Sequence, residues 1–160
     1  MIRWLRHGES TWNAAGRLQY GDPTPPLTET GRRQARDAAD RLQGAPVWML
    51  LSSPARRAVE TAEIVAEVLG LPVELDDRLV ERGRDETVES VRSRLADLLH
   101  ERGDGLLVVS HGDTIAIAVE QLTGVPCAVP QNAQVHVTDP LVEGPPGLLA
   151  SSRLADRKPV

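Results

Sequence analysis

Short apolar segments of strand length alternate along this chain with longer segments of helical periodicity. The strand-like segments are residues 2–5, 47–51, 73–75, 106–109 and 134–137, with a short edge piece at 148–150. The predicted helices are residues 29–42, 54–69, 87–102 and 114–123. Short, continuously apolar strands separated by helices are typical of a parallel sheet covered on both faces. The pattern predicts an α/β fold, a three-layer α/β/α sandwich around a mainly parallel sheet, with 134–137 as a last central strand.

Capping residues mark the boundaries of the expected helices. Thr28 is expected to cap a helix of about 14 residues. Ser53-Pro54 is predicted as the N-cap and first-turn proline of the next helix, which Gly70 ends. Aromatic residues are scarce, with three Trp, one Tyr and no Phe, so the core is expected to consist mainly of Leu, Val, Ile and Ala.

Chain length, charge and cysteine content exclude several classes of protein. The length suits one domain, predicted over residues 1–150, with 151–160 as a flexible C-terminal tail. The net charge of −5 argues against a nucleic-acid partner, which requires a basic surface. Cys127 is the only cysteine, so an internal disulfide is impossible and a reducing compartment fits. Without a secretory signal or a run of roughly 18 apolar residues, the chain is expected to be cytoplasmic, with no membrane partner.

Three polar tripeptides directly follow strand-like segments: Arg6-His7-Gly8, Ser52-Ser53-Pro54 and Ser110-His111-Gly112. In open parallel sheets ligands bind outside the carboxyl ends of the strands, so the three tripeptides are expected to lie together. A glycine after a histidine allows the backbone to approach a ligand closely. The first and third tripeptides therefore hold the candidate histidines, whereas His100, on a helix, and His136, within a strand, are interpreted as structural or surface residues.

The longer motifs around these tripeptides resemble those of the histidine phosphatase superfamily, also called the phosphoglycerate mutase-like family. The resemblance covers most of residues 2–140, and its motifs follow one another in the expected order. They are Leu5-Arg6-His7-Gly8-Glu9-Ser10 with Trp12-Asn13, Pro26-Leu27-Thr28 with Gly31 and Gln34-Ala35, Ser52-Ser53-Pro54 with Arg57-Ala58 and Thr61-Ala62, and Val109-Ser110-His111-Gly112. One such motif is a weak signal, but four in order are specific.

The resemblance implies catalytic roles for His7, Glu81 and His111. His7 would attack phosphorus in line and form a phosphohistidine that water later hydrolyses. It must be neutral to attack, so its pKa is expected below the reference of about 6.5, lowered by adjacent guanidinium groups. His111 would donate a hydrogen bond to the phosphoryl oxygens and stabilise charge in the transition state.

The resemblance also implies a phosphate-binding group of Arg6, Asn13, Arg57 and His111. The planar fork of arginine matches the geometry of a phosphate group. Asn13 occupies a family position that hydrogen-bonds the phosphoryl group. Arg56 directly precedes Arg57, but the family motif places the phosphate-binding arginine immediately before an alanine, which selects Arg57.

The proton donor for the leaving group is expected to be Glu81, because Leu79-Val80-Glu81 matches the Leu-x-Glu motif of the family. Directly after it the chain departs from the family pattern. Many relatives continue with Trp-Glu-Gly and a long insertion over the active site, whereas residues 82–87 here lead straight into a helix. Asp85 and Glu86 therefore stay open as alternative donors, and the nearly absent cap predicts an open site.

No metal or cofactor is predicted. The histidines lack the spacing of metal ligands on a helix, and one cysteine supplies no thiolate cluster. Arginines would provide the positive charge that a metal otherwise brings. The chain has no P-loop and no glycine-rich dinucleotide motif. Cys127 is interpreted as inert packing.

The predicted function is a metal-independent phosphatase that hydrolyses a phosphomonoester through His7. Alternatives are a phosphoglycerate-mutase-type phosphotransferase, a phosphohistidine protein phosphatase and a non-catalytic phospho-ligand binding module. A mutase must keep water from its phosphohistidine, usually under a lid, so the missing insertion favours hydrolysis. The partner would be a small phosphorylated substrate or a phosphoprotein, selected by loops at 18–26, 82–86 and 125–132. Tyr20 and Trp12 would either stack on a ring of the substrate or pack within the protein.

Overall fold

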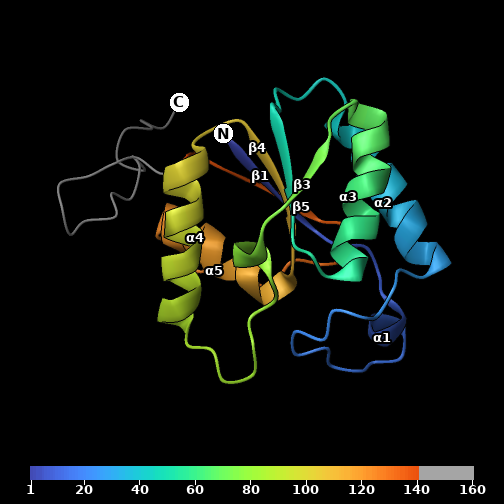
Figure 1. The fold of residues 1–160 in the computed structure, drawn as a ribbon, viewed down its shortest axis with the longest axis horizontal. Helices are drawn as coiled ribbons and strands as arrows, with labels where there is room; N and C mark the ends of the chain where they lie inside the picture. Colours follow the sequence, from blue (N-terminus) through green and yellow to red (C-terminus); the bar gives the residue numbers. More distant parts are fainter. Residues whose placement is uncertain (141–160) are drawn as a thin grey trace, which may run out of the picture.

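The computed structural model describes residues 1–140, which form a five-stranded sheet with helices on both faces (Figure 1). The strand order is β3-β2-β4-β1-β5. The strands are β1 (Ile2–Arg6), β2 (Met49–Ser52), β3 (Val73–Leu75), β4 (Leu106–Ser110) and β5 (Val135–Thr138). The first four strands in this order run parallel, and β5 pairs antiparallel with β1. The sheet is therefore mainly parallel, as predicted.

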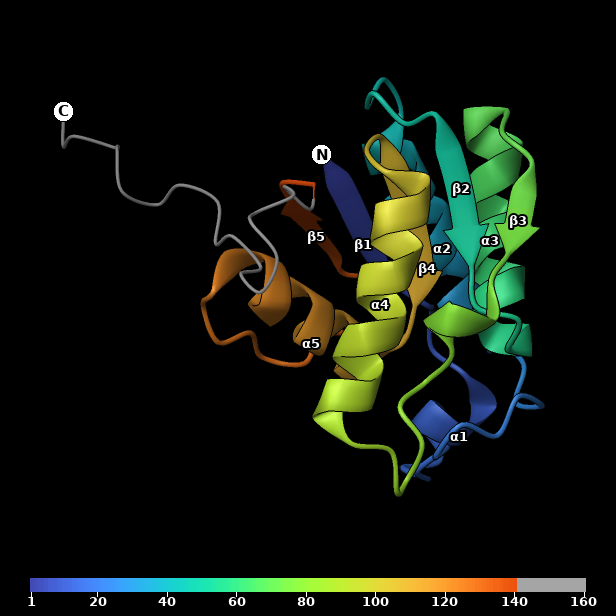
Figure 2. The same ribbon diagram turned by 60° about the vertical axis from the view of Figure 1, so that its left-hand side comes forward.

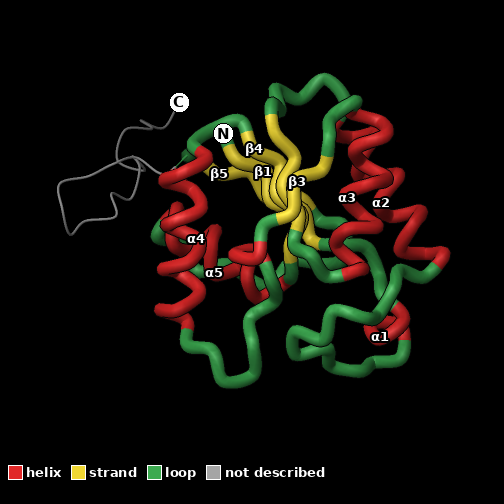
Figure 3. The backbone as a smooth tube through the Cα atoms, in the orientation of Figure 1, coloured by secondary structure: helices red, strands yellow, loops and turns green. Residues whose placement is uncertain are grey.

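Two pairs of helices make the outer layers of the sandwich. The helices are α1 (Thr11–Ala14), α2 (Glu29–Leu42), α3 (Arg56–Leu69), the 3₁₀ helix η1 (Asp77–Leu79), α4 (Val88–Arg102) and α5 (Gly112–Thr123). Figures 1 and 2 show α2 and α3 on one face of the sheet and α4 and α5 on the other. The tube in Figure 3 shows the strands between these two helical layers. The α/β sandwich expected from the sequence is confirmed.

Alternation along β4 divides the core between the two faces, because successive side chains of a strand point to opposite sides. Leu106 and Val108 pack with α4 and α5, while Leu107 and Val109 pack with α2 and α3. All four side chains are fully buried, as is typical of a central parallel strand. The continuous apolar run that predicted this strand therefore reflects burial on both faces.

Helix boundaries agree with the capping signals at two places and differ at a third. The side chain of Thr28 accepts a hydrogen bond from the backbone of the first turn of α2, and Gly70 ends α3 as its C-cap. The prediction that Ser53 caps α3 is wrong, because the N-cap is Ala55 and the helix begins at Arg56. Ser53 instead lies in the turn after β2, with its hydroxyl beside His111.

The prediction that the strand near residues 134–137 is central is also wrong. β5 lies at the end of the strand order, and no other described strand pairs with its outer side. It is only partly buried, and Val137 is exposed, as suits an edge strand. Thr138 accepts a hydrogen bond from the Trp4 indole at 3.0 Å, which holds the end of β5 against the start of β1.

The strand piece expected at 148–150 and the tail at 151–160 lie outside the described residues. No helix in the described range 1–140 has the length and apolar character to cross a membrane.

The carboxyl ends of β1, β2 and β4 meet at one end of the sheet, near α1 (Figure 1). The loop after β1 lies backbone-to-backbone on the first turn of α2. A Cβ atom added at Gly8 would lie 2.4 Å from the Gly31 carbonyl oxygen, and one added at Gly31 would lie 2.1 Å from the Glu9 carbonyl oxygen. Both glycines are therefore required for this close approach, which places His7 at the end of the sheet.

Candidate active site

His7 and His111 follow β1 and β4, two neighbouring strands, and their rings meet. The ring centroids are 5.2 Å apart with an interplanar angle of 62°. The exposed fractions are 1% for His7 and 0% for His111. Two imidazoles are thus buried edge to face at the carboxyl ends of parallel strands, where the sequence placed them.

Arg57 lies beneath the same end of the sheet, on the first turn of α3. It is fully buried, although arginine is rarely so without partners. Its Nη1 donates to the carbonyl oxygen of Asp22 at 2.6 Å, and its Nη2 donates to Glu81 Oε2 at 2.8 Å. The neighbouring Arg56 points to solvent and pairs with Glu60. The structure therefore places Arg57, and not Arg56, in the candidate site.

Arg6 approaches from the end of β1. Its Nη1 donates to the carbonyl oxygen of Pro130 at 2.7 Å. A Cβ atom added at Gly112 would lie 3.4 Å from both Nε and Cζ of Arg6 and 2.6 Å from Val129 Cγ1. The glycine after His111 thus leaves space for the Arg6 side chain.

Three buried nitrogens around the histidines have no hydrogen-bond partner within residues 1–140. They are Arg6 Nε, Arg57 Nε and His111 Nδ1. Buried donors are almost always paired in folded proteins, and an unpaired one costs about 1–3 kcal/mol. Guanidinium groups are good donors to the oxygens of a phosphoryl group. The three nitrogens are therefore chemically suited to an oxyanion.

Both histidines are held neutral. The pKa of His7 is lowered to about 3, mainly by burial and also by the charges of Arg57 and Arg6, while a hydrogen bond with Gly8 opposes the shift. Burial also lowers the pKa of His111 well below its usual value, with contributions from His7 and the arginines. The expected direction for His7 is confirmed, but burial contributes more than the guanidinium charges on which the expectation rested.

The hydrogen bond with Gly8 fixes which nitrogen of His7 carries the proton. His7 Nδ1 lies 2.7 Å from the Gly8 carbonyl oxygen. A carbonyl oxygen only accepts, so Nδ1 must be the donor of a neutral ring. The lone pair of His7 is consequently on Nε2.

The three candidate proton donors lie in different surroundings. Glu81 accepts hydrogen bonds from Arg57 Nη2 at 2.8 Å and from the backbone N–H of Gly21 at 2.9 Å. Glu86 is bound by Arg94 on α4, which together with the Gly83 backbone lowers the pKa of Glu86 to about 2. Asp85 is exposed. Of the three carboxyl groups, that of Glu81 is the one in contact with the candidate site.

The side chains of His7, Arg57 and His111 are buried, and a neighbouring loop contacts the candidate site. The loop at residues 18–26 supplies its own backbone to the site. The Asp22 carbonyl oxygen accepts from Arg57, the Gly21 N–H donates to Glu81, and the Pro23 carbonyl oxygen accepts from Arg56 N at 3.0 Å. His7 is buried even though the connection from Glu81 to α4 is short.

Asn13 reaches the site through a residue that the sequence did not single out. Asn132 Nδ2 donates to the backbone oxygen of His7 at 3.1 Å and to Asn13 Oδ1 at 3.3 Å. Asn13 Oδ1 also accepts from the Ser10 backbone N–H in the capping box of α1. Only tertiary contact reveals Asn132, since it lies far along the chain in the loop before β5.

Thr61 is a second residue whose position the sequence did not explain. Its hydroxyl donates to the Arg57 carbonyl oxygen at 2.8 Å and accepts from the Gly8 N–H at 3.0 Å. Thr61 lies one turn after Arg57 on α3. This i, i+4 spacing is the sequence feature that could have predicted that the two residues are neighbours on the helix. Thr61 thus joins the histidine-bearing loop to the helix that carries Arg57.

The two aromatic residues near the site are each covered by an arginine. The Arg17 guanidinium carbon lies 3.8 Å from the centre of the Trp12 ring, and that of Arg84 lies 4.4 Å from the centre of the Tyr20 ring. The Tyr20 contact joins the loop at 18–26 to the loop at 82–86. Each ring therefore packs on a cation in this structure.

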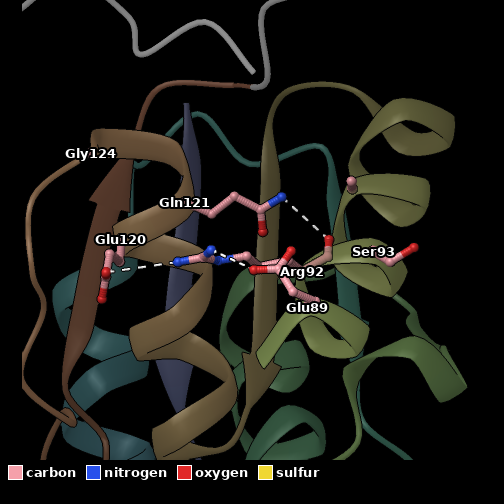
Figure 4. Close-up of a pocket in the computed structure, with 7 residues that line it drawn as sticks. Glu89, Arg92, Ser93, Glu120, Gln121 and Gly124 are labelled. Atoms are coloured by element: carbon pink, nitrogen blue, oxygen red, sulfur yellow. Dashed lines mark hydrogen bonds and ion pairs between the residues drawn. The ribbon is translucent and has the colours of Figure 1, made fainter. Parts of the chain in front are cut away.

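A hollow of about 460 Å³ lies elsewhere, between α4 and α5 (Figure 4). Its lining residues are Glu89, Arg92, Ser93, Ala96, Glu120, Gln121 and Gly124. Arg92 pairs there with Glu89 at 2.9 Å and with Glu120 at 3.8 Å. Because two carboxylates oppose its one cation, this hollow is poorly suited to a phosphate group.

Within residues 1–140, no three His, Cys, Asp or Glu side chains gather in a way that could hold a metal ion.

Burial of neutral histidines predicts a loss of stability in acid. A histidine with a lowered pKa in the folded state binds fewer protons than in the unfolded chain between about pH 6.5 and pH 3, so the free energy of unfolding falls as the pH falls through this window. For His7 alone the loss between pH 7 and pH 5 is about 2 kcal/mol. Urea unfolding at the two pH values should therefore show a smaller loss in His7→Asn than in wild type. Equal losses in the two proteins would contradict the burial argument.

Fold and side chains together define an α/β protein with buried histidines and arginines at the carboxyl ends of its parallel strands. The sequence profile of the histidine phosphatase superfamily (branch 1) matches residues 2–91, more than half of the chain. The chain belongs to this superfamily.

Curated bacterial relatives are named as mutases. The probable phosphoglycerate mutase GpmB of Photorhabdus laumondii is 47% identical over 77 residues, which cover 48% of this chain and 35% of that protein. The protein of the same name from Cronobacter sakazakii is 39% identical over 101 residues, covering 63% and 45%. The chain thus matches less than half of the length of these relatives.

Solved structures with the same fold include proteins named as phosphatases. A mycobacterial glucosyl-3-phosphoglycerate phosphatase in complex with VO3 is 26% identical with a TM-score of 0.71, covering 84% of this chain and 88% of that one. Bacillus stearothermophilus YhfR is 26% identical with a TM-score of 0.69, covering 82% and 85%. An Entamoeba histolytica phosphoserine phosphatase, solved with 3-phosphoglyceric acid, shares the fold at 21% identity and a TM-score of 0.70, covering 84% and 87%.

Proposed function

We propose that this chain is a metal-independent phosphatase that hydrolyses a phosphomonoester through a phosphohistidine on His7. The observation that carries the proposal is the neutral, buried ring of His7, whose Nδ1 donates to Gly8 and whose Nε2 keeps its lone pair. The unpartnered nitrogens of Arg6, Arg57 and His111 lie around it as donors for phosphoryl oxygens. A nucleophile beside donors for the transferred group is the arrangement that phosphoryl transfer requires.

In the first step His7 Nε2 attacks phosphorus with its lone pair, and the bond from phosphorus to the ester oxygen breaks. The leaving oxygen takes a proton from Glu81. Arg6, Arg57 and His111 hold the three oxygens of the transferred group, where negative charge must be stabilised. Arg57 Nη2 and the backbone N–H of Gly21 hold the Glu81 carboxyl group at the site.

In the second step water attacks the phosphohistidine. The bond from nitrogen to phosphorus breaks, its electron pair returns to His7 Nε2, and Glu81 accepts the proton of the water. Inorganic phosphate is then released and the neutral imidazole is restored. Asn13 and Asn132 hold the backbone of the nucleophile throughout, since Asn132 donates to both His7 O and Asn13 Oδ1.

The second candidate function is a mutase, which the names of the curated relatives favour. A mutase keeps its phosphohistidine from water and returns the phosphoryl group to the substrate. Residues 80–87 join η1 to α4 directly and leave no room for an inserted cap at this point of the chain. Together with the solved relatives named as phosphatases, this short connection favours hydrolysis. The burial of His7 favours a small phosphorylated substrate over a phosphoprotein.

The proposal is tested by trapping the intermediate on chelator-treated wild-type protein. We expect p-nitrophenyl phosphate to be hydrolysed between about pH 4.5 and 8 and a rapid alkaline quench to preserve a phosphoryl group on the peptide that contains His7. Mass spectrometry locates the group, because phosphohistidine is stable in alkali and labile in acid.

Two results would overturn the proposal in favour of the alternatives. A phosphohistidine that persists in water and decays only when phosphoglycerate is added would identify a mutase. Binding of inorganic phosphate without phosphorylation of the protein or release of p-nitrophenol at any pH would identify a binding module.

A further inference from the structure

The two nitrogens of the His111 ring lie in different surroundings. Nε2 lies 2.8 Å from the hydroxyl oxygen of Ser53, and Nδ1 is buried without a partner in the described part of the chain. A neutral imidazole has one N–H donor and one acceptor nitrogen. The position of its single proton therefore decides whether His111 presents a donor or a lone pair to the pocket.

The hydrogen bonds of Ser53 decide where that proton lies. Ser53 is fully buried, and its oxygen accepts from the backbone N–H of Ala55 at 3.3 Å. Its hydroxyl proton needs an acceptor, because a buried donor without one costs about 1–3 kcal/mol. Among residues 1–140, His111 Nε2 is the acceptor within hydrogen-bonding distance. Ser53 therefore donates to Nε2, and the ring proton is on Nδ1.

His7 and His111 consequently share one tautomer but turn opposite nitrogens to the pocket. The Gly8 carbonyl occupies Nδ1–H of His7 and leaves the lone pair of Nε2. The Ser53 hydroxyl occupies Nε2 of His111 and leaves the donor Nδ1–H. One ring is thereby prepared as a nucleophile and the other as a hydrogen-bond donor.

We propose that Ser53 is a positioning residue, which fixes the proton of His111 on Nδ1 so that this nitrogen donates to a phosphoryl oxygen. The phosphoryl acceptor rests on the proposed function, whereas the location of the proton does not. The role also accounts for the start of α3 at Arg56. Ser53 hydrogen-bonds His111 in the turn after β2 and does not cap the helix.

Long-range ¹H–¹⁵N spectra of wild-type protein labelled with ¹⁵N-histidine test the location of the proton without any turnover. We expect His111 to show a protonated Nδ1 and an unprotonated, downfield-shifted Nε2 at neutral pH. Assignment follows from the loss of these signals in His111→Asn. A proton on Nε2 of wild-type His111 would overturn the proposal, whether or not the protein is a phosphatase.

Two serine variants test the positioning role. Ser53→Ala removes the donor to Nε2, so the spectra should show a mixture of His111 tautomers, and kcat should fall roughly 10- to 100-fold with little change in KM. Ser52→Ala is the matched control, because Ser52 is the adjacent, equally buried serine and its hydroxyl donates to the Ser53 carbonyl at 2.9 Å. The control should keep the wild-type tautomer and stay within about twofold in kcat.

Two outcomes of the variants contradict the positioning role. Equal losses of kcat in both variants would indicate general damage to the turn. A Ser53→Ala protein whose His111 keeps the proton on Nδ1 would show that Ser53 does not set the tautomer. If wild type does not hydrolyse phosphate esters, the phosphatase proposal fails, while the spectra still decide the state of His111.

Discussion

Replacement of His7 by asparagine is expected to lower kcat for p-nitrophenyl phosphate by roughly 10⁴-fold or more. His7 Nε2 supplies the lone pair for covalent catalysis, and an asparagine amide has no comparable nucleophile. Asparagine is preferable to alanine, because its side-chain N–H can still donate to the Gly8 carbonyl that His7 Nδ1 now engages. The loop after β1 can thus keep its shape while the nucleophile is lost. Steady-state kinetics at neutral pH measure the effect.

The control for this variant is His100→Asn on the exposed end of α4, which should keep kcat within about twofold. Calorimetric titration with inorganic phosphate adds a second measurement. His7→Asn should still bind phosphate, since Arg6, Arg57 and His111 are unchanged. Wild-type turnover in His7→Asn would exclude His7 as the nucleophile.

Arg57→Met is expected to lower kcat/KM by roughly 10³-fold, about 4 kcal/mol of transition-state stabilisation. Methionine retains an unbranched side chain of similar reach, but it cannot donate to phosphoryl oxygens or neutralise their charge. Arg57 is fully buried, and its Nη2 holds Glu81 at 2.8 Å, so the change also removes the contact that positions the proposed proton donor. The measurement is kcat/KM with p-nitrophenyl phosphate, with thermal unfolding recorded to confirm a folded variant.

The adjacent residue provides a matched control. Arg56 carries the same side chain on the same turn of α3, but it is exposed and pairs with Glu60 on the helix surface. Exposed pairs of this kind contribute about 0–1 kcal/mol to stability, so Arg56→Met should change kcat/KM by no more than about twofold. If the two variants lose activity equally, the structural distinction between the adjacent arginines is unsupported.

Element order and the location of the site could be predicted from the sequence because both depend on local patterns. Apolar runs of strand length and helical periodicity determine which segments can be buried on two faces or on one, and the observed layers follow from that. Thr28 acts within one helical turn, so its capping role is local as well. The histidine tripeptides follow parallel strands, and the carboxyl ends of such strands lie together in any sheet of this class.

Contacts between distant segments could not be predicted in this way. The pairing of Ser53 with His111 joins residues 58 positions apart, and it competes with a helix-capping role that the local sequence favours equally. Whether Glu81 or Glu86 meets Arg57 depends on how α4 is placed, because Arg94 on that helix binds Glu86 and leaves Glu81 for the site. Whether a short apolar strand such as β5 lies at the centre or at the edge of the sheet depends likewise on which other strands pair with it.

The sequence by itself determined the alternation of strands and helices, the two histidines at neighbouring strand ends and the types of side chain that can meet a phosphoryl group. These properties are encoded over a few residues, by periodicity and by the directions in which adjacent side chains point. Tertiary packing decided the contacts of the loop at 18–26 with Glu81, the partners of Arg57 and the nitrogen of His111 that carries its proton. Each of these depends on a hydrogen bond between segments that only the folded chain brings within about 3 Å.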